Sequence, residues 1–245
     1  MVFEHRTHAG ELLAQQLGAH ARRDDAVVLA LPRGGVPVGF AVAEALEVPL
    51  DILPVRKLGV PGHEEYAMGA LASGGQPELQ AEVPRTLRIP KHTVDAVARR
   101  ALGELRRREK RYRAGRPRRE LRDRIVILVD DGMATGCTMR AALHAVRREH
   151  PRRVIVALPV AAPEACEALR SEADEIVCLL TPESSIQWGA GTTISSKPAT
   201  PRSSRCWTPP PAAGRRRRDD RPPVRQRTSH KVEIWHNCAH PSTTR

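Results

Sequence analysis

Residues 125–139 read Ile-Val-Ile-Leu-Val-Asp-Asp-Gly-Met-Ala-Thr-Gly-Cys-Thr-Met, and this stretch decides the fold. Its first five residues are all aliphatic, which is the composition of a strand buried on both faces of a parallel sheet. Asp130 and Asp131 stand where that strand should end, and a loop with glycines and threonines follows. From Met139 to Arg148 apolar residues recur at helical spacing. The stretch therefore predicts a strand, a loop and the start of a helix.

The loop has the composition of a phosphate-binding turn. The first N–H groups of a helix lack partners within the helix and carry partial positive charge, so they bind anions well. Glycine lets the backbone approach an anion closely, and Thr135 and Thr138 add hydroxyl donors. Because the carboxylates of Asp130 and Asp131 would repel that phosphate, we assign them to sugar hydroxyls or to Mg²⁺ beside it. The pattern predicts a ligand with a phosphate, an adjacent sugar diol and a metal ion.

This pattern resembles the phosphoribosyl diphosphate (PRPP) signature of the type I phosphoribosyltransferases, in which a hydrophobic strand leads into two acidic residues and a Thr-Gly-x-Thr loop. The resemblance implies that Asp130 and Asp131 hold the 2- and 3-hydroxyls of the ribose. It also implies that they contact Mg²⁺ indirectly, through the ribose or water. The 5-phosphate would then lie in a cradle formed by Ala134, Thr135, Gly136, Cys137 and Thr138. The cysteine is a departure, since glycine or serine is common at its position.

A second strand–loop–helix unit precedes this one. Residues 26–31 form a short apolar run, which leads into Pro32-Arg33-Gly34-Gly35 and a helical stretch to Leu46. The loop offers a guanidinium group and two flexible peptide units that could converge on an anion. The resemblance implies that Arg33, Gly34 and Gly35 bind the diphosphate of PRPP. A simple turn between a strand and a helix would have the same residues, so the assignment depends on the first loop.

A third predicted strand covers residues 50–55 and ends at a basic pair. Arg56 and Lys57 are followed by Leu58-Gly59-Val60-Pro61-Gly62, which is typical of a flexible loop. The resemblance implies that this pair opens a mobile loop and neutralises the departing diphosphate. Residues 64–80 then show alternating small or apolar residues and a Gly74-Gly75 turn, and they predict a small antiparallel hairpin. In the family an inserted hood covers the acceptor base, and we place the hood near residues 60–90.

Residues 92–123 are predicted to be one long, basic helix. Residues 85–124 hold 16 Lys and Arg against 5 Asp and Glu. Such charge can bind nucleic acid, but the chain contains only 3% aromatic residues to stack on bases. We therefore expect a solvated or subunit-contacting helix, compatible with a homodimer, and no nucleic-acid partner.

Three further segments complete the predicted fold, two strands at 153–160 and 175–180 with a helix at 163–171 between them. Strands that alternate with helices predict parallel pairing. The expected class is α/β, with a Rossmann-like parallel sheet of about five strands flanked by helices and a small antiparallel hood. This phosphoribosyltransferase domain is expected to cover residues 1–183.

Residues 184–245 differ in composition from the rest of the chain. They are rich in Ser, Thr, Pro and Arg, and they carry 12 Lys and Arg against 3 Asp and Glu. Without sustained periodicity, this tail is expected to be disordered, and a basic arm for nucleic acid is the alternative. We also hypothesise that it is read in a shifted frame, because another frame can encode an aromatic ending similar to that of stand-alone PRPP-binding relatives. Sequencing the DNA around codons 183–188 tests this idea.

The composition of the whole chain also bears on its location. The net charge is +12, and most of it belongs to the tail. No run of apolar residues is long enough to span a membrane, and the five cysteines show no paired spacing. We expect a cytoplasmic protein with reduced thiols and no membrane partner.

These patterns together predict a Mg²⁺-dependent phosphoribosyltransferase that uses PRPP and a small-molecule nitrogen acceptor, a nucleobase by resemblance. Its catalytic residues would be Arg33, Lys57, Asp130 and Asp131. The alternative is a non-catalytic PRPP- or nucleotide-sensing regulator, because some members of this superfamily keep the pocket without useful catalysis. A dinucleotide-binding protein or phosphohydrolase is disfavoured, since the loops lack a Gly-x-Gly-x-x-Gly motif and a Walker lysine.

Overall fold

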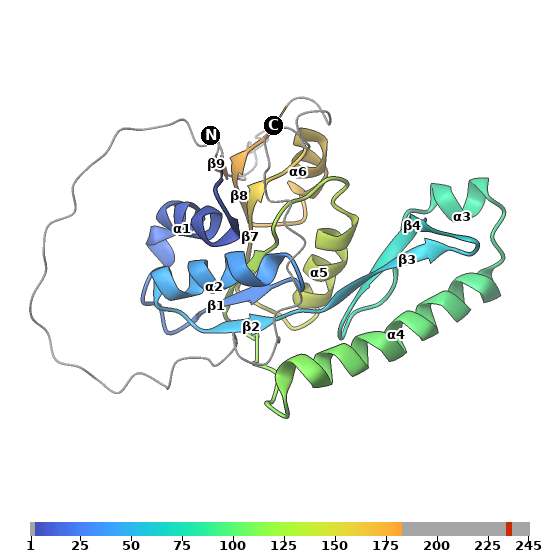
Figure 1. Cartoon of the computed structure of the whole chain (residues 1–245), viewed down its shortest axis with the longest axis horizontal. Helices are drawn as coiled ribbons and strands as arrows, with labels where there is room; N and C mark the ends of the chain where they lie inside the picture. The colour runs from blue at the N-terminus through green and yellow to red at the C-terminus, as the bar shows by residue number, and fades with distance from the viewer. Residues whose placement is uncertain (1–2, 183–233, 237–245) are drawn as a thin grey trace, which may run out of the picture.

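The computed structural model describes residues 3–182 and 234–236, and its centre is a parallel β-sheet (Figure 1). Five parallel strands lie in the order β2-β1-β6-β7-β8, and β9 (Ile234–His236) pairs antiparallel with β8. The parallel strands are β1 (Ala26–Ala30), β2 (Leu50–Ile52), β6 (Ile125–Val129), β7 (Arg153–Val160) and β8 (Glu175–Leu180). The predicted Rossmann-like α/β sheet is therefore confirmed.

Helices cover both faces of this sheet, because successive side chains of each strand point to opposite faces. On one face Val28 packs into a core shared with Leu13 and Val42, while on the other Leu29 joins a core with Leu143. The first face carries α1 and α2 and the second carries α5 and α6 (Figure 1). The helices are α1 (Arg6–Gln16), the 3₁₀ turn η1 (Gly18–His20), α2 (Gly35–Leu46), α5 (Cys137–Arg147) and α6 (Pro163–Leu169).

A smaller unit projects from this layered domain and forms the hood, defined here as residues 55–113 (Figure 1). Its three strands pair antiparallel in the order β3-β4-β5, and α4 packs on them through Leu58, Met68 and Leu105. The predicted antiparallel hood is confirmed, although it begins before residue 60 and includes all of α4. Its elements are β3 (Val55–Val60), β4 (His63–Ala72), β5 (Glu78–Leu79), α3 (Glu82–Thr86) and α4 (Lys91–Arg113).

The prediction for residues 50–62 was wrong in two respects. The single strand expected at 50–55 is divided, because β2 ends at Ile52 and β3 begins at Val55 in the other sheet. Arg56 and Lys57 therefore lie inside β3, and most of the stretch predicted as a mobile loop is strand. Leu58 and Val60 are buried against α4, so tertiary packing overrides the loop-like glycines.

The predicted basic helix ends earlier than expected, at Arg113 rather than near residue 123. Ala114 and Gly115 adopt left-handed conformations, with φ of 48° and 85°, and Pro117 follows. A left-handed residue after the last turn and a nearby proline both stop an α-helix. The basic composition of residues 114–123 therefore does not extend α4.

Arg113 joins the hood to the main sheet through a buried ion pair. Its Nη1 donates to Asp51 Oδ1 at 2.7 Å and to Oδ2 at 3.0 Å, and its Nη2 donates to the Ile52 carbonyl at 3.2 Å. Its Nε donates to Glu109 Oε1 at 2.9 Å, and Glu109 accepts from Ser73. The two ends of the hood meet here, because Asp51 and Ile52 stand just before β3 and Arg113 closes α4.

The hood also packs on α5, the helix that begins at the predicted phosphate loop. Val55 and Ala70 of the hood contact Cys137 and Ala141 of α5. His144 on α5 bridges two carboxylates, with Nδ1 2.8 Å from Glu78 Oε1 and Nε2 2.7 Å from Glu172 Oε2. The hairpin is thus held against the first turns of α5.

Two expectations concern parts of the chain that the structure does not describe fully. The proposed disorder or frame shift of residues 184–245 lies outside the described residues, apart from the short strand β9. Among residues 3–182 and 234–236, no helix is both long and apolar enough to cross a membrane.

Candidate active site

The two predicted loops lie side by side at the switch point of the sheet. β1 and β6 are neighbours, with Ala30 opposite Val129, while β2 lies on the other side of β1. The chain thus leaves β1 toward one edge of the sheet and continues from β6 toward the other. In open α/β sheets, ligands bind in the crevice where the connections diverge, at the carboxyl ends of the strands.

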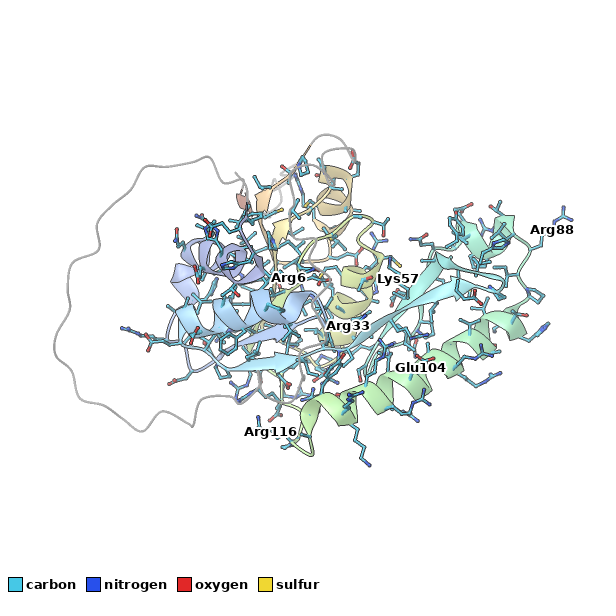
Figure 2. The ribbon with its side chains drawn as sticks, in the orientation of Figure 1. Arg6, Arg33, Lys57, Arg88, Glu104 and Arg116 are labelled. Carbon is cyan, nitrogen blue, oxygen red and sulfur yellow. The ribbon has the colours of Figure 1, made fainter. Side chains whose placement is uncertain are left out.

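The β1–α2 and β6–α5 loops are in direct contact. Leu31 N donates to the Val129 carbonyl at 2.9 Å. A Cβ on Gly34 would lie 2.2 Å from Asp131 Oδ2, and one on Gly35 would lie 2.7 Å from the Val129 carbonyl oxygen. A Cβ on Gly35 would collide with the backbone that follows β6, and one on Gly34 would displace the Asp131 carboxylate, so the two glycines allow the loops to approach this closely. The Pro32–Arg33 peptide bond is cis, and the exposed Arg33 side chain lies near the start of α2 (Figure 2).

The two acidic residues differ in their surroundings. Asp130 is half-buried and accepts a hydrogen bond from the Asp131 N–H at 2.8 Å. Burial, followed by the negative charge of Asp131, raises the pKa of Asp130 to about 8. The carboxylate of Asp131 instead contacts a guanidinium group. Neighbouring carboxyl groups with divergent environments can serve different roles toward one ligand.

That guanidinium belongs to Arg6, which the sequence analysis missed. Arg6 Nε and Nη2 donate to Asp131 Oδ2 at 2.9 and 2.8 Å, although the residues are 125 positions apart in the chain. Arg6 is the first residue of α1. The one local sequence feature that could have pointed to a role for Arg6 is its place at the start of a helix, where positive charge is unfavourable.

The residues predicted to form the phosphate cradle are the loop before α5 and the first turn of that helix. Gly136 precedes the helix in a left-handed conformation, with φ of 73°, and no side chain caps the first turn. Ala134 and Thr135 are exposed and Thr138 is half-buried. The loop is anchored where Met133 N donates to the Val160 carbonyl at 3.0 Å and the Met133 carbonyl accepts from Ala162 N at 2.9 Å. An anchored, uncapped helix N-terminus suits an anion.

Cys137 and Lys57 link this cradle to the hood. Cys137 is the first residue of α5 and is buried against Ala70. Burial raises the pKa of the Cys137 thiol, and a hydrogen bond with Gln80 and the charges of Arg140 and Lys57 oppose that shift. Lys57 is exposed on β3 and lies beside α5 (Figure 2). The hood therefore brings one cation toward the cradle.

Arg56 is placed differently from its neighbour, because adjacent strand residues point to opposite faces. Its Nη1 lies 2.5 Å from Glu104 Oε2 on α4. Of the predicted basic pair, Lys57 is thus directed to the α5 side while Arg56 pairs within the hood. Diphosphate contact by Arg56 stays a prediction.

The described residues contain no group of three or more His, Cys, Asp or Glu side chains that could hold a metal ion by themselves. Asp130 and Asp131 nevertheless suit Mg²⁺, which keeps several waters and binds through one or two carboxylates together with substrate oxygens. The pair fits an ion that arrives with a phosphorylated ligand.

Comparison with known proteins agrees with this geometry. Residues 4–197 match the family model described as "Phosphoribosyl transferase domain", and the chain belongs to that family. The match extends past residue 183, so the predicted domain boundary stays a prediction.

Individual relatives give a finer comparison. The chain is 45% identical over 181 residues to the Mycobacterium tuberculosis protein named "Putative phosphoribosyl transferase Rv0571c", in strain H37Rv, and equally to its counterpart MT0597 in strain CDC 1551. These matches cover 74% of this chain but 41% of each relative, so the chain spans less than half their length. The crystal structure of TT1426 from Thermus thermophilus is 45% identical, with a TM-score of 0.65, and covers 78% of this chain and 90% of that one.

Proposed function

We propose that this chain is a phosphoribosyltransferase that transfers the 5-phosphoribosyl group of PRPP to a nitrogen acceptor, a nucleobase by preference, and releases diphosphate. The observation that carries the proposal is the contact between the β1–α2 and β6–α5 loops at the switch point. At this point the β1–α2 loop, with its arginine and glycines, can bind one phosphorylated end of a sugar. The β6–α5 loop, with its two acidic residues, can bind the other end.

The cradle at the start of α5 would hold the 5-phosphate. The free N–H groups of its first turn and the hydroxyls of Thr135 and Thr138 supply donors without a competing side-chain cap. Asp130 and Asp131 would accept the ribose hydroxyls and favour positive charge on the ring in the transition state. The protein's share of catalysis is then positioning and electrostatics.

The departing diphosphate would face Arg33 from the β1–α2 loop and Lys57 from the hood. The bond from C1 to the diphosphate oxygen breaks as the acceptor nitrogen bonds to C1, and the acceptor's proton is released. Mg²⁺ held through Asp130 and Asp131 would supply further charge neutralisation to the diphosphate when bound. Arg33 is exposed and Lys57 has no ion-pair partner among the described residues, so both cations are available.

The test is diphosphate release from PRPP and Mg²⁺ with a panel of nucleobases, alongside calorimetry with PRPP. The substitution Lys57→Ala is expected to lower kcat about 100-fold, because this is the usual cost of removing one donor that stabilises charge in the transition state. The change in PRPP affinity should be smaller. Lys91→Ala is the matched control, because Lys91 is exposed at the start of α4. Equal loss in both variants would contradict the role of Lys57.

A PRPP- or nucleotide-sensing regulator is the second candidate. The Arg56–Glu104 pair favours it, because this pairing occupies one of the cations expected to assist the leaving group. Tight PRPP binding without diphosphate release for any base would select the regulator, whereas release with one base selects the enzyme.

A further inference from the structure

The position of Arg6 is not explained by the stability of its own helix. It is the first residue of α1, and the first turn contains no acidic side chain. A cation at a helix N-terminus opposes the helix dipole. The His5 side chain already caps α1 by accepting from His8 N at 3.0 Å. A contact outside the helix must therefore account for this arginine.

The packing of α1 aims Arg6 at the crevice. A Cβ on Gly10 would lie 2.6 Å from the Val38 carbonyl oxygen and 2.7 Å from Ala41 Cβ, so α1 and α2 approach at backbone contact there. Phe3, just before the helix, is fully buried in the same core. The start of α1 is thus anchored on both sides of Arg6, whose side chain is labelled in Figure 2.

The contact with Asp131 uses one carboxylate oxygen and spares the other. Both guanidinium donors, Nε and Nη2, bind Oδ2. No nitrogen donor among the described residues binds Asp131 Oδ1. The neighbouring Asp130 carboxyl group hydrogen-bonds with the Asp131 side chain when it is protonated, and it gives up this contact when it loses its proton. The side chains are 23% and 27% exposed, so the pair, which lies beside Gly34, is partly accessible to a ligand.

We propose that Arg6 is a positioning residue for PRPP, which fixes the Asp131 carboxylate so that Oδ1 receives a ribose hydroxyl. This inference rests on the proposed function. Arg6 acts through Asp131 and does not touch the substrate. Partners that orient a ligand-binding side chain typically change affinity by tens of fold when they are removed.

An exposed arginine–carboxylate pair provides the control. Arg22 Nη2 lies 2.6 Å from Glu47 Oε1, and these side chains are 73% and 57% exposed. Arg6→Gln should raise the Kd for PRPP about tenfold in calorimetry with Mg²⁺, whereas Arg22→Gln should leave it unchanged. Arg6→Lys should fall between wild type and Arg6→Gln, because an ammonium group keeps the charge but lacks the planar fork.

A double-mutant cycle separates positioning from a general structural role. If Arg6 acts through Asp131, adding Arg6→Gln to Asp131→Asn should weaken PRPP binding no further than Asp131→Asn alone. In steady-state assays the KM for PRPP should rise with a smaller change in kcat. Should Arg6→Gln fail to fold, the same cycle is run with Arg6→Lys.

The outcomes distinguish the two proposals. Wild-type protein that does not bind PRPP would overturn the proposed function and this inference with it. Wild-type protein that binds PRPP while Arg6→Gln binds equally well, or additive losses in the cycle, would overturn the role of Arg6 alone.

Discussion

Two of the arginine–aspartate pairs that join distant parts of this chain, one at the hood junction and one beside the β1–α2 loop, differ in what they leave unsatisfied. Arg113–Asp51 at the hood junction is buried, with side chains 8% and 4% exposed, and both oxygens of Asp51 accept from the guanidinium. Arg6–Asp131 in the crevice is 23% and 27% exposed, and one oxygen of Asp131 is bound. The same two residue types thus form a closed network in one place and an open one in the other.

The difference indicates which pair serves structure and which serves a ligand. A buried charge must be paired, because an unpaired one carries a large desolvation cost. At the junction Arg113 also donates to Glu109 and to the Ile52 carbonyl, so nothing remains for a ligand to satisfy. In the crevice, the Arg6 guanidinium leaves Asp131 Oδ1 available as an acceptor, and the loop that carries Asp131 leads into an uncapped helix N-terminus.

The largest expected effect is on stability, at the junction. Asp51→Asn would leave Arg113 buried with a neutral partner, and the unfolding free energy should fall by ~3 kcal/mol. Chemical denaturation measures this change. Asp25→Asn is the control, because Asp25 forms exposed ion pairs with Arg23 and Arg152, and it should have little effect. Similar losses in the two variants would show that burial does not distinguish the pairs.

The matched substitution in the crevice, Asp131→Asn, should affect PRPP binding more than stability. Asp131→Asn should alter the unfolding free energy by ~1 kcal/mol or less, as for a partly exposed pair. It should raise the Kd for PRPP about 100-fold, because an amide is a weaker hydroxyl acceptor than a carboxylate. Denaturation and PRPP calorimetry on the same preparation provide both values. A large stability loss with unchanged binding would make the crevice pair structural as well.

The fold was predictable because its signals are local. The apolar runs at residues 26–31 and 125–129 correspond to β1 and β6, and the loops after them were placed together because parallel strands share a carboxyl edge. Strand β3 was missed because its glycines and basic pair are typical of a loop, whereas pairing with β4 and packing on α4 make it a strand. The end of α4 at Arg113 depends on left-handed backbone after it.

The site was predictable only where a residue stands inside a local sequence motif. Gly34 and Asp131 were expected to share a ligand, and the structure places them in contact. Arg6 was not expected, because no sequence pattern connects residues 125 positions apart. Arg56 and Lys57 were treated as one pair, although strand alternation directs Arg56 to Glu104. A local sequence pattern does not predict which distant residue a single side chain will contact.

The last expected effect appears only when the pH is varied, and it is the pH dependence that the Asp130 carboxyl group gives to stability. Asp130 has a pKa of about 8 in the folded protein, against about 3.9 in an unfolded chain. Between these values the native state holds a proton that the unfolded state has lost. Raising the pH through this window therefore lowers the unfolding free energy. Asp130→Asn removes that proton linkage, so the variant should gain stability relative to wild type as the pH rises from about 4 toward 8.

Denaturation curves without PRPP or Mg²⁺ over that pH range measure the difference between wild type and Asp130→Asn. Asp131→Asn should flatten the wild-type dependence in part, because the charge of Asp131 is the second cause of the raised pKa. Parallel pH profiles for wild type and Asp130→Asn would mean that solvent reaches Asp130 freely. Burial would then not destabilise the charged form of Asp130. The crevice and the hood junction would differ only in how many carboxylate oxygens accept hydrogen bonds.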